Sequence, residues 1–114
     1  MLEVNSYVPS KGDIVWFDFD PSAGKEIQKR RPALVVSRHD FNRTTGFAIV
    51  CPITTTQLNY PTRVQLPHMI KTKGQIVIPQ LKSLDFNSRQ VEFIEKLPEG
   101  YIQRVDQIIQ YIFN

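Results

Sequence analysis

Short apolar runs, separated by polar turns rich in proline and glycine, make up most of this chain. The runs are rich in β-branched and aromatic residues, and several of them alternate apolar with polar positions, a pattern typical of β-strands. The pattern predicts strands at residues 13–19, 32–37, 47–53, 62–66, 74–83 and 89–97, with a bend at Pro79 in the fifth strand.

The first predicted strand is apolar on both faces at its centre, as a small barrel requires. Its aromatic residues are therefore assigned to the core rather than to a peptide-binding groove. By contrast, residues 62–66 alternate polar with apolar positions and are expected to be half-exposed. The side chains assigned to the first strand's two buried faces are Ile14, Val15, Trp16, Phe17 and Phe19.

Proline and glycine positions predict where elements end. Pro52 is expected to end the third strand or make it irregular, because proline cannot donate to a β-ladder. Residues 38–46 are predicted to form a short helical turn that Ser37 caps and Gly46 ends. A second short helical turn is predicted at residues 84–88.

One longer helix is predicted at the C-terminus. It begins at Pro98 and Glu99, which suit a helix N-terminus. Its apolar residues recur at a spacing of three to four, so one face should lie on the sheet. This apolar stripe comprises Ile102, Val105, Ile108 or Ile109, and Ile112.

These elements together predict a mainly β protein with short helices. About six short strands and a C-terminal helix indicate a small, mostly antiparallel barrel or a strongly bent sheet. With 114 residues, the chain is expected to form a single domain, residues 1–114, with a modest core.

Several classes of site are excluded by composition. The single cysteine, Cys51, permits no intrachain disulfide and no multi-cysteine metal site, and its apolar setting predicts a buried, inert thiol. His39 and His68 lie far apart in the sequence and are expected at the surface, so no metal and no cofactor is predicted. Residues 1–6 lack the features of a signal peptide, and no apolar run is long enough to span a membrane. A cytoplasmic protein with no membrane partner is expected.

Positive charge is concentrated in the loop predicted at residues 21–32. The loop carries a formal charge of +3, which equals the net charge of the whole chain. Cations gathered with one carboxylate suit an anionic ligand such as a phosphodiester, although a solvated basic turn has the same composition. The charged residues of this loop are Lys25, Glu26, Lys29, Arg30 and Arg31.

A run of hydroxyl residues at 54–56 follows the third predicted strand, and strand ends can converge on one rim of a small barrel. If they do, Arg31 can bind a phosphate oxygen bidentately while Thr54 donates to another. Glu26 can then accept the proton of a ribose 2′-hydroxyl. Arginine stays protonated in proteins, so Arg31 is assigned to transition-state charge stabilisation and Glu26 to the base. The alternative for the threonines is an ordinary β-rich turn.

The sequence resembles the MazF/PemK (Kid) toxins of type II toxin–antitoxin systems. The likeness covers essentially the whole chain, and the order and spacing of its motifs hold throughout. The matching pieces are Y-V-P at 7–9, G-D-I-V-W-F-D-F-D-P at 12–21, G-K-E at 24–26, R-P-A-L-V-V-S at 31–37, Asn42, T-G at 45–46, P-I-T-T at 52–55, Y-P at 60–61 and Q-L-K-S-L at 80–84.

This resemblance implies an SH3-like barrel of the CcdB/PemK (MazF) type that forms a homodimer. It implies a sequence-selective endoribonuclease that cuts single-stranded mRNA without metal and so stops growth. The 2′-hydroxyl attacks the phosphate, leaving a 2′,3′-cyclic phosphate and a 5′-hydroxyl. A cognate antitoxin with a disordered acidic tail is expected to block the RNA groove. Promoter DNA is expected to be contacted only through that antitoxin.

The resemblance also assigns residues by motif. The family's catalytic arginine falls on Arg31, its catalytic threonine on Thr54 and its loop glutamate on Glu26. Pro79 stands where the family commonly has aspartate. This implies either that Glu26 has a larger role in catalysis or that the protein prefers a different nucleobase. Lys29 and Arg30 replace smaller or polar residues and should add phosphate contacts. The RNA-binding residues predicted in all are Lys25, Gln28, Lys29, Arg30, Thr55, Thr56, Gln80 and Lys82.

Two other functions remain open. Because Pro79 replaces the usual acid, the chain is alternatively a non-catalytic toxin of the same barrel class, which binds a protein such as gyrase or binds RNA without cutting it. A plain SH3-like adaptor domain is disfavoured, since such domains present aromatic-lined grooves rather than one charged loop.

Overall fold

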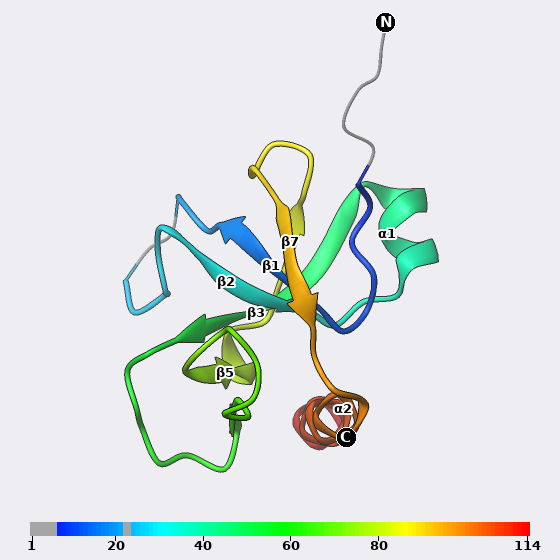
Figure 1. The fold of residues 1–114 in the computed structure, drawn as a ribbon. Coiled ribbons are helices and arrows are strands. Elements are labelled where there is room, and N and C mark those ends of the chain that lie inside the picture. Colours follow the sequence, from blue (N-terminus) through cyan, green and yellow to red (C-terminus); the bar gives the residue numbers. More distant parts are fainter. Residues whose placement is uncertain (1–6, 22–23) are drawn as a thin grey trace, which may run out of the picture.

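The computed structural model describes residues 7–21 and 24–114. In these residues, seven strands, two α-helices and one 3-10 turn follow each other along the chain (Figure 1). The elements are β1 (Asp13–Asp18), β2 (Arg30–Val35), α1 (His39–Thr45), β3 (Phe47–Thr54), β4 (Arg63–Gln65), β5 (Gln75–Val77), η1 (Ile78–Gln80), β6 (Lys82–Asp85), β7 (Glu92–Lys96) and α2 (Glu99–Phe113).

The strands form one strongly bent sheet in the order β4-β5-β3-β2-β1-β7, in which β6 also pairs with β3. Every strand pair is antiparallel. The bend lies in β3, which pairs with β6 along its first half and with β5 at its end. The predicted small, mainly antiparallel β fold with a C-terminal helix is therefore confirmed.

The sheet has a hydrophobic cluster on each side. Because successive side chains of a strand point to opposite faces, Ile14 and Val15 of β1 enter different clusters. The first cluster includes Leu34 and Cys51 and is covered by α2 through Val105. The second contains Phe17 and its neighbours. Burying a large aliphatic or aromatic side chain contributes about 1.5–3 kcal/mol, so these clusters provide most of the driving force for the fold.

Pro52 lies inside β3, where it pairs with Ala33 of β2. On the other edge of β3, pairing with β6 ends at Val50 and pairing with β5 begins at Ile53. Pro52 therefore lies in the gap between two partners, where a residue that cannot donate is tolerated. The prediction that it ends the strand is wrong, but the predicted irregularity is present.

Two helical predictions need correction. Arg38, not Ser37, is the N-cap of α1, because the Ser37 hydroxyl donates to Oδ1 of buried Asn42 at 2.5 Å and accepts from Ile49 N. Gly46 does end α1, with a left-handed φ of 76°. The helical turn predicted at residues 84–88 is wrong, since β6 continues to Asp85 and pairs there with Phe47.

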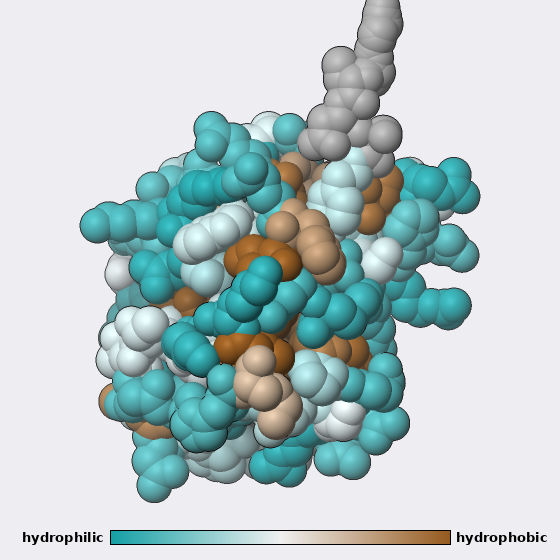
Figure 2. Space-filling view, in the orientation of Figure 1, coloured by the Kyte–Doolittle hydropathy of each residue, from teal (hydrophilic) through white to brown (hydrophobic). Residues whose placement is uncertain are grey.

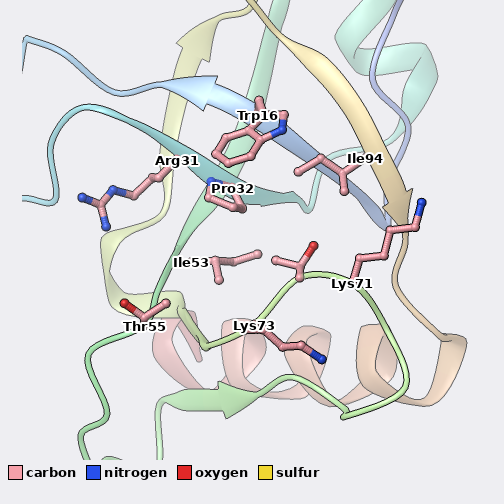
Figure 3. A pocket seen from close by; sticks show the side chains of 9 residues that line it. Trp16, Arg31, Pro32, Ile53, Thr55, Lys71, Lys73 and Ile94 are labelled. Carbon is pink, nitrogen blue, oxygen red and sulfur yellow. The ribbon is translucent and has the colours of Figure 1, made fainter.

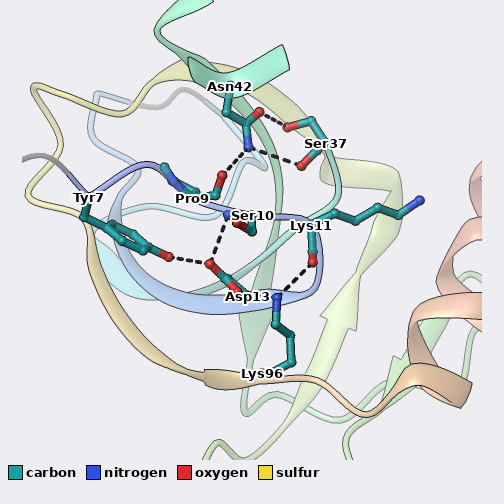
Figure 4. A network of polar contacts seen from close by, with 8 residues as sticks. All are labelled: Tyr7, Pro9, Ser10, Lys11, Asp13, Ser37, Asn42 and Lys96. Atoms are coloured by element: carbon teal, nitrogen blue, oxygen red, sulfur yellow. Dashed lines mark hydrogen bonds and ion pairs between the residues drawn. The ribbon is translucent and has the colours of Figure 1, made fainter. Parts of the chain in front are cut away.

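The segment before β1 is anchored by a polar network (Figure 4). Asp13 accepts hydrogen bonds from the Tyr7 hydroxyl at 2.6 Å and from Ser10 N at 2.9 Å, and forms an ion pair with Lys96 at 2.7 Å. Burial, followed by the hydrogen bond to Asp13, raises the pKa of Tyr7 well above its usual value. Asn42 adds a bond from its amide to Pro9 O at 2.8 Å. The prediction made for residues 1–6 lies outside the described residues.

The C-terminal helix covers the first cluster as predicted, with Val105 and Ile108 buried. Its packing ends at Ile109, however, and Ile112 is exposed rather than part of the buried stripe. Cys51 is buried, and burial raises its thiol pKa to about 12, as expected for an inert thiol. Of the helices in the described ranges, none has the length and apolar character needed to cross a membrane.

Candidate nucleic-acid interface

A cavity of about 410 Å³ opens where β1, β2 and β7 face the loop between β4 and β5 (Figure 3). Its floor is apolar, and its rim carries three basic side chains. Figure 2 shows exposed hydrophobic side chains in the middle of the face that carries β7, among hydrophilic ones. The lining residues are Trp16, Arg31, Pro32, Ile53, Thr55, Lys71, Thr72, Lys73 and Ile94.

Trp16 forms one wall of this cavity and is 40% exposed. Its assignment to the core is wrong, although Phe17 and Phe19 are buried as predicted. Trp16 shares a face of β1 with Ile14, but the first cluster under α2 includes Ile14 and not Trp16. The guanidinium of Arg30 lies 5.8 Å from the centre of the Trp16 ring. The result is an aromatic surface on which a nucleobase can stack.

Arg31 lies at the start of β2 and on the cavity rim. Its Nε donates to Gln28 O at 2.9 Å, which fixes the guanidinium against the loop. Among residues 7–21 and 24–114, none accepts a hydrogen bond from its two terminal nitrogens. Arg31 therefore combines a fixed orientation with donors available to an anion, the arrangement that bidentate phosphate binding needs.

Thr54 ends β3 beside the cavity and is buried, with 8% exposure. Its hydroxyl accepts a hydrogen bond from Thr56 N at 3.2 Å, and its neighbour Thr55 lines the cavity. The β2–β3 register pairs Ala33 with Pro52. Arg31, near the start of β2, and Thr55, the residue after Thr54, line the same cavity. The two strand ends thus border one cavity, while joint action of Arg31 and Thr54 on a phosphate stays a prediction.

Glu26 lies in a second cluster, away from the residues that line the cavity. It forms an ion pair with Lys82 at 3.0 Å, and Ile27 N donates to Gln80 Oε1 at 2.9 Å. Gln80 and Lys82 thus tie the basic loop to η1 and β6. Pro79, in place of the usual acid, is exposed within η1.

The other predicted RNA-binding residues are divided between exposed and structural positions. Lys29 has a positive φ of 71°, and its backbone N donates to Asp20 Oδ1 at 2.9 Å. Arg30 is already paired with Gln90 O and Glu92. Ser22 and Ala23 of the loop lie outside the described residues. Predicted residues that do not line the cavity are Lys25, Gln28, Lys29, Arg30, Thr56, Gln80 and Lys82.

The far wall of the cavity was missed by the sequence analysis. Its basic residues are Lys71 and Lys73, on either side of the buried Thr72. Two lysines spaced by one threonine are a signal, but these residues lie between the strands predicted at 62–66 and 74–83 and received no role. Their position depends on contacts with β7, which lies more than twenty residues further along the chain.

Glu95 of β7 holds this wall in place. Its Oε1 accepts from Lys71 N at 3.1 Å, and its Oε2 accepts from Thr72 N and the Thr72 hydroxyl, both at 2.7 Å. Partial burial acts to raise the pKa of Glu95. The Thr72 hydroxyl, the two backbone N–H groups and the positive charge of Lys71 together outweigh burial and hold this pKa below its usual value. The carboxylate is therefore kept ionised.

Comparison with known proteins gives consistent matches. The family described as PemK-like, MazF-like toxin of type II toxin–antitoxin system matches residues 10–113. The endoribonuclease toxin MazF of Escherichia coli (strain K12) is 38% identical over 86 residues, which cover 75% of this chain and 77% of that protein.

Two solved structures extend the match to the fold. A crystal structure of MazF from Deinococcus radiodurans superposes with a TM-score of 0.91 and 35% identity, over 95% of this chain and 98% of that chain. A MazE–MazF crystal structure from the same organism gives a TM-score of 0.84 and 31% identity, over 96% of this chain and 98% of that chain.

Proposed function

The chain belongs to the PemK-like, MazF-like toxin family of type II toxin–antitoxin systems, and we propose that it is an endoribonuclease that cleaves single-stranded RNA at a short sequence motif. The observation that supports the proposal is that Arg31 and Thr55, the residue after Thr54, line one cavity together with Trp16. Such a site offers donors for a phosphate and a stacking surface for a base.

In the proposed reaction, the ribose 2′-oxygen attacks the adjacent phosphorus while the bond from phosphorus to the 5′-oxygen breaks. The products are a 2′,3′-cyclic phosphate and a 5′-hydroxyl, and no metal takes part. Arg31 stabilises the negative charge that develops on the phosphate oxygens, with its terminal N–H groups as donors. The Thr54 hydroxyl donates to another of these oxygens, for which it can turn while still accepting from Thr56 N.

Glu26 is proposed as the base that takes the 2′-hydroxyl proton. Its carboxylate is held by an ion pair with Lys82 at 3.0 Å. Glu26 does not line the cavity, so the loop must bring it nearer when RNA binds. The remaining proton transfer, to the departing 5′-oxygen, is not assigned to a side chain.

We propose that a cognate antitoxin with an acidic tail neutralises the toxin by occupying the same cavity. Related MazF chains have been crystallised with MazE, which supports an antitoxin partner. The apolar floor and basic rim suit a peptide that carries both apolar and acidic side chains. The toxin is further proposed to act as a homodimer and, because mRNA is its substrate, in the cytoplasm.

The proposal is tested by incubating the purified protein with long single-stranded RNA in EDTA and mapping the new 5′ ends by sequencing. The expected result is cleavage at one short motif, with 5′-hydroxyl and cyclic phosphate ends. Arg31→Ala should lower the cleavage rate by about a hundredfold or more. Arg43→Ala removes an exposed charge in the last turn of α1 and serves as the matched control. Intact RNA with wild type, or full activity in Arg31→Ala, would refute the proposal.

A second candidate function is RNA binding without cleavage. It is favoured by one observation, the absence of any carboxylate among the described residues that line the cavity. Wild type incubated with RNA in EDTA distinguishes the two functions. A nuclease produces new 5′ ends, whereas a protein that acts by binding alone shifts the RNA in a gel and leaves it intact.

A further inference from the structure

Three basic side chains line the cavity, and they are differently engaged. Arg31 is held by the loop before β2. The Lys73 ammonium donates to His68 O at 3.1 Å and to Ile70 O at 3.0 Å, so these hydrogen bonds stabilise its own loop. Lys71 is exposed, and among the described residues its ammonium has no hydrogen-bond acceptor. Arg31 and Lys71 are therefore the two cavity cations with the most donors available to a ligand, since Lys73 keeps only one of its three.

Other cations on or beside β7 are neutralised within the protein. Lys96 pairs with Asp13 at 2.7 Å, Lys11 pairs with Asp106 at 2.9 Å, and Arg30 is engaged by Glu92. A phosphate that reaches the β7 side of the cavity thus finds Lys71 as its available positive partner. Figure 3 shows Lys71 and Arg31 on opposite sides of the cavity, with Trp16, Pro32 and Ile53 between them.

Glu95 presents an apparent contradiction, because a carboxylate beside an RNA site repels phosphates. Its hydrogen bonds explain why it is there. Both carboxylate oxygens are used to fix the backbone of Lys71 and Thr72 and the Thr72 hydroxyl against β7. Such charge-assisted bonds from adjacent N–H groups are among the stronger ones in proteins. They hold the backbone of Lys71 in one place, which lowers the backbone entropy lost when its ammonium binds an anion.

We propose, on the basis of the proposed RNA-cleaving function, that Lys71 binds a second phosphate of the RNA, at the end of the cavity opposite Arg31, and that Glu95 is the residue that positions Lys71. The base between the two phosphates then lies over the apolar floor beside Trp16. Lys71 is a binding residue and takes no part in bond breaking. Glu95 acts through the loop and does not touch RNA.

Binding measurements test the role of Lys71 apart from catalysis. The ligand is a single-stranded RNA that contains the mapped motif with a 2′-deoxy nucleotide at the cleavage position, which prevents cutting. Lys71→Ala should weaken binding about fivefold at low salt, and the slope of log K against log salt should become shallower by about 0.7, the value for one phosphate contact on a single strand. Arg43→Ala, which removes the same charge on α1, should leave the slope unchanged.

Neutral analogues of single phosphates in the RNA show which phosphate Lys71 contacts. Methylphosphonates are placed one at a time along the same RNA, and one position next to the cleavage site should weaken binding to wild type. That position should have no further effect on Lys71→Ala. If every position weakens wild type and Lys71→Ala alike, or if the salt slope is unchanged in the variant, the Lys71 contact is refuted while cleavage by wild type stands. Wild type that neither binds nor cuts RNA refutes both proposals.

The Glu95→Gln variant shows whether Glu95 positions Lys71 or repels RNA. If Glu95 merely repels RNA, the variant binds more tightly; if it positions Lys71, the variant binds more weakly. The cleavage assay should show a higher KM with an unchanged kcat. In the Lys71→Ala background, Glu95→Gln should cause no further weakening, because its effect passes through Lys71. Thr72→Val removes the hydroxyl donor alone and should reproduce part of the loss. Tighter binding by Glu95→Gln, or equal weakening in both backgrounds, overturns the positioning role.

Discussion

Arg31 illustrates how one side chain is oriented without losing its binding capacity. One nitrogen donates to Gln28 O in its own loop, and the other two have no acceptor among the described residues. The guanidinium plane is thereby fixed before the proposed RNA substrate binds. Preorganised donors cost little reorganisation during the reaction, so they contribute strongly to transition-state stabilisation.

We expect Arg31→Lys to be nearly as inactive as Arg31→Ala. Lysine keeps the charge, but it lacks the planar fork and the Nε that donates to Gln28. The cleavage rate should fall by about a hundredfold, measured in single-turnover assays with saturating enzyme. Arg43→Lys on α1 should retain full activity. Activity of Arg31→Lys close to wild type would mean that charge alone suffices at this position.

Glu95 is expected to make stability depend on pH in the acid range. Its pKa is lowered in the folded protein, so it binds its proton less readily there than in the unfolded chain. Its stabilising contribution is therefore fully present above the unfolded pKa and is lost as the pH falls through the folded pKa. The difference in Tm between wild type and Glu95→Gln should be largest near neutral pH and shrink below about pH 4. A difference that is constant from pH 7 to pH 3 would contradict this account.

At the residue scale, motifs could identify Arg31 and the threonines at 54–55, because these positions lie in short contiguous patterns. They could not identify Lys71 or Glu95. The hydrogen bonds between them join a loop to a strand about two dozen residues away in the sequence. Their meeting depends on the pairing of β7 with β1, in which Glu95 lies opposite Ile14. Nothing in the local sequence encodes that register.

At the scale of elements, the cavity depends on how β3 and the β4–β5 loop approach each other. Gly74 permits this approach, because a Cβ at that position would lie 2.3 Å from Thr54 O. Gly74 also has a φ of +119°, a backbone conformation that residues with a side chain rarely adopt. The end of β3, which carries Thr54, and the loop that carries Lys71 are therefore linked through one glycine.

Gly74→Ala is expected to destabilise the protein by about 2–4 kcal/mol and to reduce RNA cleavage, since both the backbone and Thr54 must shift. Urea unfolding measures the first effect. Gly100→Ala is the matched control, because its Cβ would meet nothing within 4 Å in the first turn of α2. That substitution should be neutral or stabilise by up to about 1 kcal/mol. Equal effects of the two substitutions would show that the close approach to Thr54 is unimportant.

Periodicity predicted the strands well where one face or both are buried, as in β1, β2 and β3. It failed at residues 84–88, where Asp85 belongs to β6 and its carboxylate accepts from Asn87 N in the following turn. A short polar segment with turn-forming residues suits a helical turn or a strand end equally well. The partner strand decided the outcome, through the pairing of Phe47 with Asp85.

At the scale of the whole molecule, exposed apolar side chains collect at the end of α2. Tyr111 is 78% exposed and Phe113 is 70% exposed, and Tyr60 in the nearby loop is 59% exposed. A cavity lined by Pro61, Thr62 and Tyr111, among others, joins the loop to the helix. Such a surface is costly to leave in water, which favours burial against a second copy of the chain.

The proposed homodimer should therefore depend on this surface. Sedimentation equilibrium of wild type at micromolar concentration is expected to give the mass of two chains. Tyr111→Ser combined with Phe113→Ser should shift the mass towards one chain, because it removes the two most exposed aromatic side chains of α2. Phe41→Ser, at an exposed position on α1, is the control for loss of an exposed aromatic residue. A dimer that survives the α2 substitutions but dissociates in Phe41→Ser would place the interface on the α1 side. Circular dichroism of each variant separates dissociation from unfolding, since the buried face of α2, Val105 and Ile108, is unchanged in both.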